Sequence, residues 1–284
     1  MTAQLLHAPE QATTTPGTRR GRRISRRSLL VAAGVVLVLV VVCLLWQLAY
    51  DQEWVNPLFL SNPVAVATAL WNGVVHGELL GALGITLYET IVGFLLALVS
   101  GMVVGTLLHQ LPLVNRIVRP YLTLLNNLPR LALAPIFVLW FGVGREARIA
   151  LVLSFVFFVI ALNTQAGLLN TDRDRLVLAK ALGAGRFETF WKFQVPEAIP
   201  TWFAGFQLGL TYSFLGAIVG EMLTGGDGIG AEVSIGLAVY RTDQVYAEII
   251  IMAVVATLLS GAIRVAEERL LRWRRYELRG LAKR

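Results

Sequence analysis

Apolar residues form long runs along the chain, and short polar segments separate these runs. A helix needs about 20 apolar residues to cross the hydrocarbon core of a bilayer. Six segments approach that length, and their expected bounds are residues 29–48, 85–108, 120–141, 147–168, 199–222 and 249–265. The pattern predicts an all-α polytopic membrane protein with about six transmembrane helices.

Composition and charge support the same interpretation. Of the 284 residues, 56% are hydrophobic and 15% are charged, which is more apolar than a water-soluble domain of this size. The formal charge of +7 is a feature that nucleic-acid-binding proteins share, but here the basic residues lie between the apolar runs. We therefore expect the lipid bilayer, and no nucleic acid, as the surroundings of the chain.

Basic residues also set the expected orientation. A cluster precedes the first run, at Arg19, Arg20, Arg22, Arg23, Arg26 and Arg27, whereas residues 50–84 contain no Lys or Arg. Because Lys and Arg concentrate in cytoplasmic loops, we expect a multi-pass protein of the inner cell membrane with both termini in the cytoplasm. Residues 25–30 resemble a twin-arginine export signal, but the long apolar run without a small-x-small cleavage site favours a retained helix.

The runs divide the chain into five expected parts. These are a disordered basic cytoplasmic tail (1–28), a first transmembrane helix (29–49), an extracytoplasmic segment (50–84), a core domain of five transmembrane helices (85–268) that includes the loop 170–198, and a basic cytoplasmic tail (269–284). In the extracytoplasmic segment, Asn62 and Pro63 predict the start of a short amphipathic helix. We expect Trp71 of this helix at the level of the lipid headgroups.

Polar residues inside the third and fifth runs are candidates for a translocation path. Pro129 interrupts the third run, and Arg130 would lie at membrane depth, where a charge is costly unless it faces protein or water. The alternative is that Arg130 reaches the headgroups or that this helix begins later. In the fifth run Gln207 and Thr211 share one helical face, although such polar groups often bond only their own or a neighbouring helix. The candidate path residues are Asn126, Asn127, Arg130, Gln207, Thr211 and Glu221.

The sequence lacks the motifs of catalysis and cofactor binding. The glycine-rich run after Glu221, residues 225–230, predicts a tight turn and lacks the Lys of a phosphate-binding loop. His7, His76 and His109 lie in separate segments, and Cys43 is the only cysteine, so neither a metal cluster nor a His-based triad is supported. We expect no enzyme activity and no bound cofactor.

Residues 170–198 form the loop between the fourth and fifth runs, on the expected cytoplasmic side. Thr171 or Asp172 is placed to cap a helix that runs to Leu182, and Gly183 is placed to end it. This loop is the longest polar interruption in the second half of the chain before the C-terminal tail.

A second short helix is expected over residues 186–193, ending before Pro196. Its spacing places Phe187, Phe190 and Trp191 on one face. An apolar face of this size needs a covering surface, which is either lipid or a second protein.

This loop resembles the segment that marks the permease subunits of bacterial ABC importers. Their pattern is Glu-Ala-Ala, three residues, Gly, nine residues and Ile-x-Leu-Pro; here Ala179, Gly183 and Phe193-x-Val195-Pro196 stand at those spacings. Val177 and Leu178 replace the first two positions of the pattern. The resemblance narrows to the nitrate, sulfonate and taurine type through further segments in the family's order: 86–88, 93–94, 128–135, 140–144, 220–221 and 228–230.

The resemblance implies a type I ABC importer permease fold within a larger complex. Two permease chains, taken as identical, would work with a cytosolic ABC ATPase dimer, which binds the ATP, and with an extracytoplasmic substrate-binding protein. The loop would form a coupling helix seated in the ATPase. The residues assigned to this coupling are Ala179, Leu182, Gly183, Ala184, Arg186, Phe187, Phe190, Val195 and Pro196.

The implied substrate is a small organic or oxyanion solute, either sulfonate-, nitrate- or taurine-like or a pyrimidine or other aromatic heterocycle. Many relatives carry Arg where this chain has Glu89 and Gln207, which slightly favours the heterocycle. The alternative is a secondary carrier or channel that works without an ATPase, although we find no paired repeat of the kind such carriers contain. A membrane enzyme and a vitamin-binding membrane component are disfavoured, by the scattered His residues and by the loop pattern respectively.

Overall fold

The computed structural model describes residues 26–56 and 58–270, and helices are the regular elements throughout these ranges. The long helices are α1 (Arg26–Asp51), α3 (Glu78–Gln110), α4 (Pro112–Asn126), α6 (Arg145–Leu169), α9 (Val195–Thr224) and α11 (Thr242–Leu270). The shorter elements are α2 (Pro63–Val75), η1 (Arg130–Leu133), α5 (Ala134–Phe141), α7 (Arg173–Ala181), α8 (Arg186–Thr189), η2 (Phe190–Gln194) and α10 (Ile229–Ala238).

The number of spans agrees with the sequence pattern. Within the described residues, five helices are long and apolar enough to cross a membrane, and a bent pair makes a sixth span when it is counted as one. The prediction of an all-α membrane protein with about six spans is therefore confirmed. The predicted tails lie largely outside the described residues, at positions 1–25 and 271–284.

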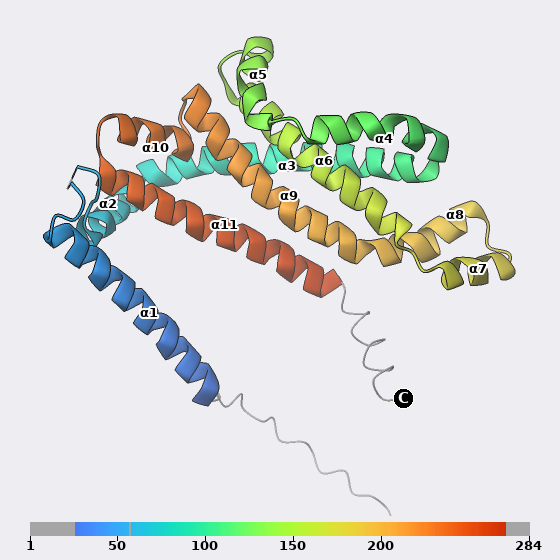
Figure 1. Cartoon of the computed structure of the whole chain (residues 1–284), viewed down its shortest axis with the longest axis horizontal. Helices are drawn as coiled ribbons and strands as arrows, with labels where there is room; N and C mark the ends of the chain where they lie inside the picture. Colours follow the sequence, from blue (N-terminus) through green and yellow to red (C-terminus); the bar gives the residue numbers. More distant parts are fainter. Residues whose placement is uncertain (1–25, 57, 271–284) are drawn as a thin grey trace, which may run out of the picture.

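Helix α6 is the centre of the bundle, and it packs against both α3 and α9 (Figure 1). Val152, Val156 and Ile160 on α6 are fully buried. Glycines on the neighbouring helices make this packing close. A Cβ added to Gly101 of α3 would lie 2.8 Å from the Ile160 Cβ, and one added to Gly209 of α9 would lie 2.9 Å from the Ile160 Cδ1. Such small residues let helices associate tightly in lipid, where the hydrophobic effect does not drive helix against helix.

The third predicted span is broken rather than continuous. Helix α4 begins at Pro112. Its axis makes an angle of 88° with the axis of the following segment, Arg130–Phe141, which contains η1 and α5. Pro129 explains the break, because proline lacks an N–H donor and disfavours helical geometry at the preceding residue. The single span expected over residues 120–141 is thus corrected to two helical pieces.

The two ends of the bundle carry different short helices. Figure 1 shows α2 and α10 at one end and α7 and α8 at the opposite end. The start of α2 follows its sequence, because Pro63 is in the first turn and the Asn62 side chain accepts a hydrogen bond from the Ala65 N–H at 2.6 Å. Gly225 and Gly226 have φ values of +70° and +115° before α10, as expected of the glycine-rich turn. We call the α2–α10 end the outer end and the α7–α8 end the inner end.

Helix α1 presents apolar side chains around its circumference. Among its exposed residues are Leu37, Val38 and Leu44, each at least 60% exposed in this chain. Near the outer end, the Trp46 indole N–H donates to the Ser61 carbonyl at 2.8 Å. A helix with this composition is stable where lipid covers it.

Candidate coupling surface and translocation path

The inner loop begins with α7, whose start and end follow from its sequence. The Asp172 carboxylate accepts a hydrogen bond from the Asp174 N–H at 2.9 Å, which makes Asp172 the cap. Thr171, the other candidate, is buried, and its hydroxyl donates to the Leu168 carbonyl. Gly183 follows the helix with φ +78°, a left-handed conformation that favours glycine.

The second loop helix does not end before Pro196, so that prediction is wrong. Helix α8 continues through the π-helical turn η2 directly into α9. Pro196 lies in the first turn of α9, and a local π-helical adjustment is a known way to accommodate the donor that proline lacks. The loop helix and the fifth span are therefore one uninterrupted helical segment, which changes direction between α8 and α9 (Figure 1).

An apolar surface is exposed on this helical segment and on the residue that follows α7. Phe187 is 75% exposed and Leu182 is 73% exposed. Trp191, which is 54% exposed, packs its ring 5.3 Å from the Phe190 ring and 6.2 Å from the Phe187 ring. The aromatic face expected from the spacing is thus present, and we call Leu182, Phe187, Phe190 and Trp191 the inner apolar surface. Exposed clusters of this kind usually mark an interaction site.

Charged residues border the inner apolar surface. Arg186 is exposed, and the Lys192 ammonium lies 2.8 Å from the Glu188 carboxylate. The hydrogen bond and the charge of Lys192 lower the pKa of Glu188 below its usual range. An apolar centre with a solvated charged rim is typical of a protein interface.

Hydrogen bonds and an ion pair attach the loop to the helical bundle. The Glu197 carboxylate at the start of α9 accepts a hydrogen bond from the Asp172 N–H at 2.9 Å and pairs with Arg175 at 3.0 Å. On the other side, His109 at the end of α3 lies 3.2 Å from the Gln194 side chain in η2. Ala179, Ala184, Val195 and Pro196 are buried or half-buried, so these predicted coupling residues support the loop from within.

Arg130 lies where the third span breaks, and it ties the break to α6. Its guanidinium donates to the Phe155 carbonyl at 2.9 Å and to the Asn126 backbone and side-chain oxygens. It also lies 5.9 Å and 5.7 Å from the ring centres of Phe155 and Phe158. Asn127 is exposed. The charge is thus packed against protein, which is one of the two environments that the sequence argument required.

Gln207 and Thr211 occupy a different place. Both are exposed on α9, and the Thr211 hydroxyl donates to the Gln207 carbonyl at 3.0 Å. Gln207 lines a groove of about 320 Å³ between α9 and α11. The other lining residues are Ala256, Thr257, Ser260, Gly261 and Arg264. Within the described residues, no hydrogen bond joins this groove to Arg130.

Glu221 was expected on the path, but its surroundings argue against that role. Its side chain is fully buried, accepts a 2.7 Å hydrogen bond from the Thr86 hydroxyl and accepts another from the Gly230 N–H at 2.8 Å. The Thr86 hydroxyl in turn accepts from the Ile229 N–H at 3.0 Å. Glu221 therefore joins α3, α9 and α10 instead of facing an open channel.

Glu221 belongs to a buried charged cluster that the sequence analysis did not identify. Glu89, on the same helix as Thr86, is fully buried, and one of its oxygens lies 3.3 Å from the Arg148 guanidinium of α6. Arg148 is 5% exposed and also donates from Nε to the Gly144 carbonyl. We call Thr86, Glu89, Arg148 and Glu221 the outer charge cluster. The signal was available, because single charges of opposite sign stand inside two apolar runs.

The broken span, the polar groove and the long apolar helices are features of a helical membrane transport protein. The sequence agrees with this interpretation, because residues 93–272 match the family model described as binding-protein-dependent transport system inner membrane component. The chain belongs to this family, and it is an ABC importer permease of the sulfonate, taurine and nitrate type.

Individual relatives agree with this assignment. The taurine transport system permease protein TauC of Escherichia coli (strain K12) is 28% identical over 252 residues, which cover 87% of this chain and 90% of TauC. The formylaminopyrimidine transport permease protein ThiX of Halalkalibacterium halodurans is 33% identical over 184 residues, 65% of this chain and 74% of ThiX. A chain of the MetNI methionine ABC transporter, solved in inward-facing conformations, has the same fold with a TM-score of 0.60 at 20% identity, over 70% of this chain and 96% of that one.

Proposed function

We propose that this permease receives the work of ATP hydrolysis from a separate ATPase through the inner apolar surface. The observation that carries the proposal is the uninterrupted helical segment from Arg186 to Thr224, which has exposed aromatic residues at its inner end. A push on Phe187 or Trp191 is passed to the fifth span through helical residues alone, because α8, η2 and α9 follow one another without a break. The contacts of Glu197 with Asp172 and Arg175 carry the same push to α7.

The proposed assembly follows the family. Two permease chains, taken as identical, work with a cytosolic ATPase dimer that binds the ATP and with an extracytoplasmic protein that delivers the substrate. The N- and C-termini then lie in the cytoplasm with the inner apolar surface. In this proposal the permease itself binds no cofactor. When the ATPase closes, the two helical bundles move and expose the path alternately to the two sides of the membrane.

The proposed path runs past the broken third span and the groove beside Gln207. Arg264 brings a guanidinium group into this groove, together with the hydroxyls of Thr257 and Ser260. These groups favour an anionic solute or one rich in hydrogen-bond acceptors. The sequence preference for a heterocycle relied on Glu89 and Gln207 at positions where many relatives carry Arg. Arg264 supplies a guanidinium group beside Gln207 and weakens that argument. We therefore propose a sulfonate-like oxyanion as the first substrate class to test and a pyrimidine as the second.

Cysteine cross-linking tests the coupling surface directly. The sequence has a single cysteine, so Cys43→Ser gives a cysteine-free background. Phe187→Cys in this background is expected to cross-link to the ATPase that co-purifies with the chain, and cross-linking should change when ATP is added.

Trp71→Cys is the matched control for this experiment. Trp71 is 70% exposed, close to the value for Phe187, but it lies on α2 at the outer end. We expect no ATPase adduct from this position. If Phe187→Cys captures only lipid, or if uptake in vesicles proceeds without ATP and without the ATPase, the proposal is wrong.

A further inference from the structure

A pocket at the outer end holds an excess of negative charge. Its volume is about 620 Å³, and it lies between α2, the start of α3, α10 and the start of α11. Four carboxylates line it, from Glu78, Glu232, Asp243 and Glu248, against one guanidinium, from Arg241. Nothing in the coupling mechanism or in the groove beside Gln207 uses these residues.

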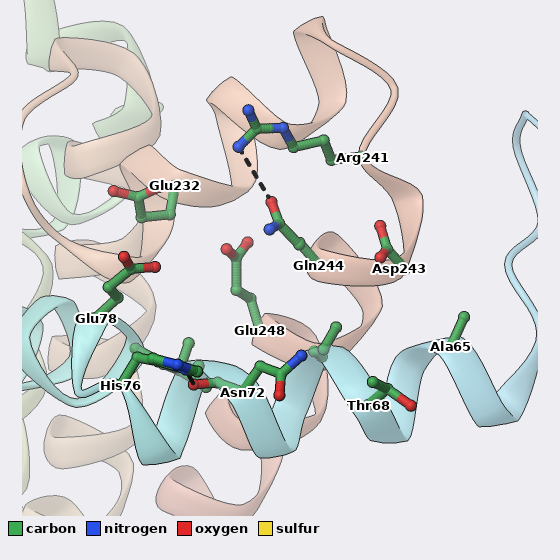
Figure 2. Close-up of a pocket in the computed structure, with 14 residues that line it drawn as sticks. Ala65, Thr68, Asn72, His76, Glu78, Glu232, Arg241, Asp243, Gln244 and Glu248 are labelled. Carbon is green, nitrogen blue, oxygen red and sulfur yellow. Dashed lines mark hydrogen bonds between the residues drawn. The ribbon is translucent and has the colours of Figure 1, made fainter.

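The positive charge in the pocket does not neutralise the carboxylates. The Arg241 guanidinium lies 3.4 Å from the Gln244 side-chain oxygen, and none of the four carboxylates forms an ion pair within the described residues. The His76 Nδ1 lies 2.8 Å from the carbonyl oxygen of Asn72 in its own helix. Figure 2 shows Glu78, Glu232 and Glu248 around one open space, with Arg241 turned towards Gln244.

Glu248 makes this pocket more than an acidic surface. Glu248 is only 8% exposed, and its Oε2 atom is buried without a hydrogen-bond partner. A buried carboxylate oxygen without a partner is costly, and the cost falls when a cation or a donor occupies the space beside it. Because Glu248 is directed into the pocket (Figure 2), the missing partner would enter from the outer solution.

We propose that this pocket binds a positively charged organic group, an ammonium or a guanidinium. A bare metal ion fits less well, because within the described residues no three His, Cys, Asp or Glu side chains are arranged to hold one. The volume and the dispersed carboxylates instead suit a cation with several N–H donors on a short carbon chain. The ammonium or guanidinium group belongs either to a free organic cation or to a Lys or Arg side chain of the delivering protein.

The binding test uses the purified full chain in lipid nanodiscs with propylguanidinium and propylammonium as probes and propionate as the anionic control. Saturation-transfer NMR is expected to show that both cations bind to the unchanged chain and that propionate does not. Glu248→Gln should weaken cation binding about tenfold or more, because it removes a charge-assisted hydrogen bond.

Glu146→Gln is the matched control, since it removes an exposed carboxylate at the start of α6, outside the pocket. Its cation binding should equal that of the unchanged chain. Glu232→Gln provides a variant at an exposed pocket position that does not disturb packing, and a smaller loss of binding is expected there. The proposal is overturned if the unchanged chain binds neither cation, or if Glu248→Gln and Glu232→Gln bind them as well as Glu146→Gln does.

A second measurement separates the two sources. If a side chain of the delivering protein fills the pocket, propylguanidinium and Glu248→Gln both weaken the docking of that protein. If a free cation fills it, docking is unchanged and the probe remains bound in the docked complex. The proposal goes beyond the coupling function, and the first measurement needs no ATPase, so the two can fail separately.

Discussion

The inner and outer ends of the bundle use polar and apolar residues in opposite ways. At the inner end, Phe187 and Leu182 are about three-quarters exposed, although burial is worth about 1.5–3 kcal/mol for each such side chain. At the outer end, Glu89 and Glu221 are fully buried, although burying a charge is costly. Each end thus keeps residues where an isolated chain would not place them.

The two ends differ in what compensates the cost. In the outer charge cluster, Glu221 is hydrogen-bonded within the chain by Thr86 and the backbone of α10. The buried oxygens of Glu89 accept no hydrogen bond, and the charge of Arg148 at 3.3 Å compensates for their burial. Among residues 26–56 and 58–270, nothing covers the inner apolar surface in this way, and the proposed ATPase would cover it. Substitutions at the outer end should therefore change the stability of the fold, whereas substitutions at the inner end should change the response to the partner.

Removing Arg148 should have the largest effect. In Arg148→Leu, Glu89 would remain buried without its ion-pair partner, and breaking a buried pair in this way costs about 3–5 kcal/mol. Unfolding of the purified chain in detergent measures the loss. Arg145→Leu, one turn earlier and exposed, should change the free energy of unfolding little. Equal stability of the two variants would contradict the structural role of the outer charge cluster.

Removing the hydroxyl of Thr86 should cause the next largest loss of stability. Thr86→Val removes both the donor to Glu221 and the acceptor for the Ile229 N–H, and each orphaned group costs about 1–3 kcal/mol. Thr90→Val is the control, because Thr90 is equally buried but bonds only the Thr86 carbonyl of its own helix. Only the first variant should show a lower midpoint of unfolding and faster amide exchange at the start of α10.

The contrast between the ends also explains which features could be predicted from the sequence. Most of the spans, the helix caps and the helix end at Gly183 depend on local patterns of apolar residues, Asn, Asp, Pro and Gly, so they were predicted from the sequence. The aromatic face of Phe187, Phe190 and Trp191 is likewise a local periodicity. These predictions needed no knowledge of which helices are neighbours.

The outer charge cluster depends on contacts between residues far apart in the chain. Thr86 and Glu221 are 135 positions apart, and neither sequence neighbourhood reveals the other. Glu221 was therefore assigned to the path because it is charged, although its partners remove it from solvent. Pro196 was misread as the end of a helix, although it lies in the first turn of α9, where proline is tolerated.

Substitution of Gly183 is expected to change the stability of the fold least. The same substitution is expected to change coupling most. A Cβ at Gly183 or at Gly185 would meet no atom within 4 Å, but only Gly183 has a positive φ, +78°. Gly183→Val should therefore strain the turn by about 1–2 kcal/mol and shift Leu182 relative to Phe187, whereas Gly185→Val should not. In proteoliposomes with ATPase and binding protein, Gly183→Val should lower uptake per ATP hydrolysed while both variants insert equally. Full uptake by Gly183→Val would show that the shape of the inner apolar surface does not govern coupling, and the contrast between the two ends would then concern stability alone.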